Sequence, residues 1–145
     1  MQVTGRCLCG HISYEADVNE NLVVICHCTT CQRHSGTTFG TVVGINGDSF
    51  KLLSGKLKSY ESVADSGNLR SRTFCPECGT RIYAKTVGDK PGFVGLRAGT
   101  VDQRDQLVPK MQTWCRSAQP WALIDSLPQI ETQPGAEDFA RIAAS

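Results

Sequence analysis

Three cysteines within six residues form the densest group of reactive side chains in the sequence. Cys26, Cys28 and Cys31 stand at C-x-C-x-x-C spacing, with His27 and His34 close by. Thiolates and imidazoles are ligands that zinc favours in proteins, and a structural zinc ion takes four of them. The group therefore indicates either a structural site completed by a histidine or a reactive site with one open position.

Two further cysteine pairs, far apart in the chain, share a pattern that suits a metal-binding turn. They are C-L-C-G at residues 7–10 and C-P-E-C-G at residues 75–79. Gly10 and Gly79 permit the left-handed backbone that such turns often use, and Pro76 fixes φ inside the second turn. Four unrelated buried thiols are the alternative, which this spacing disfavours. We predict one structural, tetrahedral zinc site with the ligands Cys7, Cys9, Cys75 and Cys78.

Strand geometry separates the histidine of the C-x-C-x-x-C group from its neighbours. If residues 22–28 are extended, Cys26 and Cys28 project to the same face, because side chains alternate along a strand. His27 then points to the opposite face, where we expect packing or support of a ligand rather than ligation. Cys31 falls in the first turn of a short helix, whose N-terminus favours the thiolate that zinc requires.

The fourth ligand of this second site stays open at the level of the sequence. His34 is one candidate, and a partly exposed polar residue without a metal is the alternative at that position. Cys115 lies in no chelating motif and is expected to be a free thiol. We predict a zinc ion held by Cys26, Cys28 and Cys31, with water or substrate in the fourth position, as in catalytic zinc sites. A redox C-x-x-C pair is one alternative, but that motif is typical of a βαβ context, which this sequence does not predict. An iron–sulfur cluster is another, but it would require a fourth ligand at a recognisable spacing.

Short, half-alternating apolar runs between turn residues predict a mainly-β chain that positions these side chains. The expected strands cover residues 11–16, 22–26, 38–44, 50–53, 57–61, 68–74, 81–85, 93–96 and 111–114. Residues 29–35 are expected to form a short helix, with Thr29 or Thr30 as N-cap and Gly36 as terminator. Residues 136–144 are expected to form a surface helix or a frayed end.

Length and composition predict one domain over residues 1–145 and argue against several classes of function. The net charge is +1 with no basic block, so a nucleic-acid partner is not expected. No apolar run approaches the ~20 residues of a membrane span, and the N-terminus has no apolar leader region. We therefore expect a cytoplasmic protein with no membrane partner, and cysteines in that reducing compartment are more often metal ligands than disulfides.

The cysteine motifs together resemble those of the glutathione-dependent formaldehyde-activating enzyme family, whose domain is shared with centromere protein V. The segments that carry the resemblance are GRCLCG (5–10), CHCTTCQR (26–33) followed by SG (35–36), and FCPECGT (74–80). LRAGTVD (96–102) and PW (120–121) resemble later landmarks of the family. The similarity runs from about residue 5 to residue 121, which leaves residues 122–145 as a C-terminal tail.

The resemblance implies an Mss4-like fold, in which a folded-over β-sheet is stapled by zinc. It assigns a structural zinc to Cys7, Cys9, Cys75 and Cys78 and a second zinc to Cys26, Cys28 and Cys31. It implies a carbon–sulfur lyase or synthase that joins formaldehyde to glutathione as S-(hydroxymethyl)glutathione. The expected partners are a small-molecule thiol and an aldehyde, with glutathione as co-substrate.

Basic residues near the metal motifs are candidates for binding the carboxylates of glutathione. These are Arg33, Arg70, Arg72 and Arg81, although each of them taken singly is better explained as a solvated surface charge. Two other functions remain open: a non-catalytic zinc-binding module, and a thiol- or redox-sensing protein whose second zinc is labile.

Overall fold

The computed structural model describes residues 1–88 and 92–144, and the elements below are those of this part of the chain. The strands are β1 (Gln2–Arg6), β2 (Ser13–Cys26), β3 (Gly40–Ile45), β4 (Lys51–Ser54), β5 (Lys58–Val63), β6 (Leu69–Phe74), β7 (Arg81–Thr86), β8 (Gly95–Arg97) and β9 (Met111–Thr113). The α-helices are α1 (Thr29–Ser35) and α2 (Ala136–Ala144). Short 3-10 turns cover Ala98–Thr100, Arg104–Gln106, Cys115–Ser117 and Pro120–Ala122.

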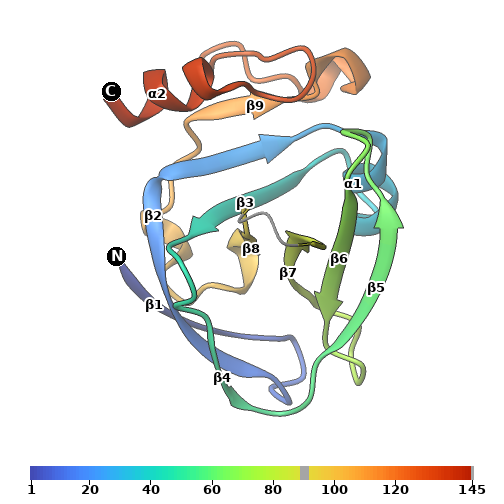
Figure 1. Ribbon diagram of the computed structural model, residues 1–145, viewed down its shortest axis with the longest axis vertical. Coiled ribbons are helices and arrows are strands. Elements are labelled where there is room, and N and C mark those ends of the chain that lie inside the picture. The colour runs from blue at the N-terminus through green and yellow to red at the C-terminus, as the bar shows by residue number, and fades with distance from the viewer. Residues whose placement is uncertain (89–91, 145) are drawn as a thin grey trace.

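The described strands form one sheet in the order β1-β2-β3-β8-β7-β6-β5, with β4 and β9 also paired to β2. Every pairing is antiparallel except that of β2 with β9. Figure 1 shows the sheet curling round, so that β4 and β5 lie on either side of the central strands and α2 covers β9. The predicted mainly-β, folded-over architecture is confirmed.

The long strand β2 departs from the prediction of two separate strands at 11–16 and 22–26. The residues between these two ranges do not end the strand but form an irregularity in register between Asn19 and Val23. Bulges of this kind bend a strand without ending it. One continuous strand therefore pairs with β1 and β4 at its start and with β3 and β9 at its end.

The first strand, β1, was missed from the sequence because its apolar alternation is weak. Its residues QVTGR alternate between exposed and buried, but only Val3 and Gly5 face inward. The strand forms because it pairs with β2, with Gly5 opposite Tyr14. Its amino-acid composition alone does not predict a strand. The Tyr14 ring lies in the core, where it stacks on Phe50 with ring centroids 5.1 Å apart.

The C-terminal segment forms the predicted helix over residues 136–144, and this surface helix is tied to the rest of the fold rather than frayed. Backbone amides of Trp114 and Cys115 donate to the carbonyls of Thr132 and Ile130, which ties the segment to the chain after β9. Phe139 and Ile142 lie three residues apart on one face of α2, and Ile142 is buried against Val24 and Met111. Tertiary packing thus stabilises a helix of only nine residues.

Among the described helices none is long and apolar enough to cross a bilayer.

Candidate metal centres and substrate cavity

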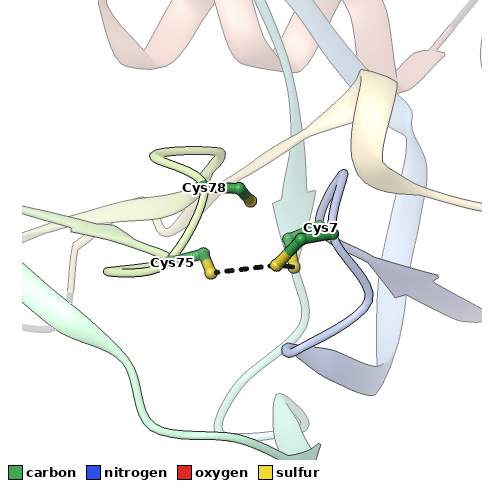
Figure 2. A group of neighbouring side chains, drawn as sticks. Cys7, Cys75 and Cys78 are labelled. Carbon is green, nitrogen blue, oxygen red and sulfur yellow. Dashed lines mark hydrogen bonds between the residues drawn. The ribbon is translucent and has the colours of Figure 1, made fainter.

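The first cysteine cluster is built from two tight turns that face each other across the sheet. One turn joins β1 to β2 and carries Cys7 and Cys9; the other joins β6 to β7 and carries Cys75 and Cys78. Figure 2 shows the side chains of Cys75 and Cys78 directed toward Cys7. The glycine that ends each turn has a left-handed backbone, with φ of 82° at residue 10 and 80° at residue 79.

The sulfur positions of this cluster fit one tetrahedral zinc ion. The four Sγ atoms all lie within 4.8 Å of one another, and Cys7 Sγ is 3.6 Å from Cys9 Sγ. Zn–S bonds of about 2.3 Å in a tetrahedron require S···S separations of roughly 3.8 Å. The backbone amide of Ile12 donates to Cys7 Sγ at 3.2 Å, and the Thr80 hydroxyl lowers the pKa of Cys78 to about 5. These hydrogen bonds favour thiolates, which is the form that binds zinc.

The second cluster lies where β2 passes into α1. Cys26 ends β2, Cys28 is the N-cap of α1, and Cys31 lies in its first turn, with all three Sγ atoms within 4.8 Å of one another. The cap is therefore Cys28 rather than Thr29 or Thr30, because Cys28 Sγ accepts the Cys31 amide at 3.3 Å. Gly36 ends the helix with φ of 72°, as predicted.

The three thiols of this second cluster share hydrogen bonds that favour a thiolate within the group. Hydrogen bonds from Cys26 and Cys28 lower the pKa of Cys31 to about 2, and the charges of Arg97 and Arg81 act in the same direction. The same contacts raise the pKa of Cys26. Thiolate character and three sulfur ligands make the cluster chemically suited to a zinc ion with one exchangeable position.

Both histidines near the second cluster lie outside the group of close sulfur atoms. His27 is fully buried on the opposite side of the strand, and its Nε2 lies 3.0 Å from Gln112 Oε1. Its ring also packs edge-on against Phe39, so the predicted packing role of His27 is confirmed. His34 does not join the three sulfurs within the 4.8 Å group, and burial beside three arginines lowers its pKa to about 4.

Cys115 is a buried free thiol, as predicted, and belongs to neither cluster. Its Sγ donates to the Gln112 carbonyl at 3.5 Å.

A cavity of about 310 Å³ opens beside the second cluster and is lined by all three of its cysteines. Four arginines also line this cavity: Arg70, Arg72, Arg81 and Arg97. Three of them come from the set expected from the sequence, whereas Arg33 is exposed on α1 and is not part of the lining. Arg97 was missed, although it lies in the LRAGTVD segment, because β8 pairs with β3 and brings it to the cluster only in the folded chain.

The cavity arginines are short of acceptors. Arg70 donates to Thr86 and Arg72 to Ser62, but Nε and Nη1 of Arg81 and Nε of Arg97 are buried without a hydrogen-bond partner. Within the described part of the chain, no carboxylate lies within 4 Å of a cavity guanidinium. Burial and the charge of Arg97 lower the pKa of Arg81 to about 9. A site of this kind favours an anionic ligand, which would supply the missing acceptors.

A mainly-β fold that carries two clusters of close cysteine sulfurs defines a class of small proteins able to hold zinc through thiolates. The family model described as glutathione-dependent formaldehyde-activating enzyme matches residues 2–117, and the chain belongs to this family. Membership supports a lyase-type function at the level of the family.

Individual proteins resemble this chain in sequence or in fold. A Schizosaccharomyces pombe protein described as an uncharacterized lyase is 31% identical over 93 residues, which is 62% of this chain and 63% of that protein. This chain thus matches somewhat less than two thirds of that relative's length. The crystal structure of a Rhodobacter sphaeroides protein has a TM-score of 0.56 at 16% identity, covering 87% of this chain and 98% of that one. This second likeness concerns the fold alone.

Proposed function

We propose that the protein is a zinc-dependent carbon–sulfur lyase or synthase that acts on adducts of glutathione, or another small thiol, with an aldehyde. The observation that carries the proposal is a single cavity lined by three clustered cysteines and four arginines. A zinc ion held by the three cysteines would have one coordination position left for the sulfur of a thiol substrate. Glutathione also brings two carboxylates, which could accept hydrogen bonds from the unpartnered N–H groups of Arg81 and Arg97.

In synthesis, the S–H group of the thiol adds across the aldehyde C=O bond. A carbon–sulfur bond forms, the carbonyl π bond breaks, and the proton ends on the former carbonyl oxygen; the lyase reaction is the reverse. The balance needs no oxidant or cofactor other than the metal. A thiolate-bound zinc, when present, favours the deprotonated form of a thiol that approaches it.

The residues of the chain would have three roles in this reaction. Cys26, Cys28 and Cys31 would hold the second zinc and leave one position for the substrate sulfur. Arg81 and Arg97 would bind a carboxylate of the thiol and so fix its sulfur beside the cluster. The cavity walls would exclude bulk water from the carbon that reacts.

The proposal is tested with the zinc-loaded protein, glutathione and formaldehyde, with formation and breakdown of S-(hydroxymethyl)glutathione followed by NMR exchange spectroscopy. The variant Cys28→Ser is expected to lose at least 100-fold in rate and to bind one zinc fewer, with its far-UV circular dichroism retained. Arg33→Met is the matched control and is expected to keep the wild-type rate, because Arg33 lies outside the cavity.

A Cys28→Ser rate equal to that of the wild-type protein would contradict the catalytic assignment. No turnover by the wild-type protein, together with release of one zinc on mild oxidation, would favour a thiol-sensing function for the same cluster instead.

A further inference from the structure

We propose that the apolar side chains lining the cavity bind an apolar group of the substrate, and that the C-terminal segment determines this specificity. The inference rests on the proposed function and names its substrate class: adducts of aldehydes that carry an apolar chain or ring, rather than the single carbon of formaldehyde. Phe139 of α2 is the specificity-determining residue.

Apolar side chains line the cavity together with the arginines. They are those of Val24, Val42, Phe93, Met111, Trp114 and Phe139. Val24, Met111 and Ile142 form a buried apolar cluster, and Val42 and Phe139 pack against it. The rings of Phe93 and Phe139 lie 6.5 Å apart, centroid to centroid, at an interplanar angle of 32°. Both sources of binding energy, charge and apolar area, thus meet in one cavity.

The C-terminal segment forms part of the cavity wall and is held there by hydrogen bonds to Trp114. Trp114 donates its indole N–H to Gln133 Oε1 at 3.2 Å and its backbone amide to the Thr132 carbonyl at 3.1 Å. These contacts hold Trp114 in a left-handed backbone, with φ of 56°, which is uncommon for a residue other than glycine. Strained backbone of this kind persists where the surrounding structure fixes it, often at ligand sites. Gln133 and Phe139 both lie beyond residues 2–117, the part matched by the family model.

The apolar side chains and the cysteine cluster line the same cavity. With the substrate sulfur at the cysteines, an apolar group on the reacting carbon would therefore have apolar side chains to contact. Each methylene buried there contributes about 0.8 kcal/mol, or up to about fourfold in affinity.

The test measures binding rather than turnover, with S-methylglutathione and S-hexylglutathione as unreactive probes in titration calorimetry of the zinc-loaded protein. The hexyl probe is expected to bind at least 30-fold more tightly than the methyl probe. Phe139→Ala is expected to reduce that ratio by about tenfold while leaving the affinity for the methyl probe unchanged. Phe139→Leu should retain most of the ratio, and Val108→Ala, an exposed residue outside the cavity, should retain all of it.

Equal affinity for the two probes, or a ratio that Phe139→Ala leaves intact, would overturn the inference. A parallel titration with acetate and octanoate separates this inference from the proposed glutathione function. If neither glutathione probe binds but octanoate binds more tightly than acetate in a Phe139-dependent way, the apolar subsite stands and glutathione is the wrong thiol. If octanoate shows no such preference either, the subsite is excluded.

Discussion

At the scale of single residues, Gly40 gives Arg97 its place beside the second cysteine cluster. A Cβ atom at Gly40 would overlap Nη1 of Arg97 and would lie 3.6 Å from the Cβ of Cys31. Gly40 is buried at the start of β3, so its lack of a side chain leaves room for a guanidinium rather than permitting an unusual backbone. The position of Arg97 in the cavity wall therefore depends on the absence of a side chain at residue 40.

The variant Gly40→Ala tests this dependence. We expect it to displace the Arg97 guanidinium and to weaken binding of glutathione about tenfold, since a hydrogen bond to a charged group contributes roughly 1.5–3 kcal/mol. Calorimetric titration with glutathione measures the change. Gly99→Ala is the matched control, because a Cβ at that position meets no atom within 4 Å. Equal affinities of Gly40→Ala and Gly99→Ala would contradict the role given to Arg97.

At the scale of elements, cysteines and hydrogen bonds join two turns from distant parts of the chain. The turn before β2 donates from the Leu8 amide to the Thr80 hydroxyl at 3.1 Å, and Cys9 Sγ lies 3.9 Å from Cys75 Sγ. A metal ion at this cluster would close a long loop, because the cysteine pairs lie more than sixty residues apart. Such sites contribute roughly 10 kcal/mol to folding, since they hardly exist in the unfolded chain.

Cys78→Ser is therefore expected to destabilise the whole fold rather than one activity. We predict the loss of one zinc per chain and a fall in the melting temperature of more than about 10 °C, measured by thermal unfolding with zinc analysis. Leu8 lies between Cys7 and Cys9, and its side chain is 82% exposed. It provides the control Leu8→Ala, which should have the melting temperature of the wild-type protein. An unchanged melting curve for Cys78→Ser would exclude a structural zinc at this cluster.

At the scale of the whole molecule, the two clusters differ in what surrounds them. The first joins the two hairpin turns and has four sulfur donors, whereas the second has three and opens into the cavity. An ion with an exchangeable position should leave its site faster than one held by four thiolates. A protein loaded with zinc at both clusters should therefore release the two ions in separate steps.

Stepwise chelation measures this difference. We expect a moderate chelator to remove one zinc with loss of activity and a small change in melting temperature. A stronger chelator should remove the second zinc and unfold the chain, and added zinc should reverse both steps. Release of both ions in one step, with activity and fold lost together, would contradict separate roles for the two clusters.

Local sequence determines much of this protein. Cysteine spacing places Cys26, Cys28 and Cys31 close together, because a strand end and one helical turn fix their separations. Alternation along β2 likewise turns His27 away from the sulfurs. Gly10 and Gly79, which follow Cys9 and Cys78, have the left-handed backbone that their turns require. Such features follow from backbone geometry over a few residues.

Only the tertiary structure decided which distant residues complete the site. Arg97 reaches the second cluster through the pairing of β8 with β3, and Phe139 reaches the cavity because α2 packs on the apolar cluster beside β2. The strand β1 and the continuity of β2 also depend on partners far along the chain. Neither propensity nor motif spacing encodes these contacts, since their free energy comes from burial and pairing that exist only once the sheet has closed.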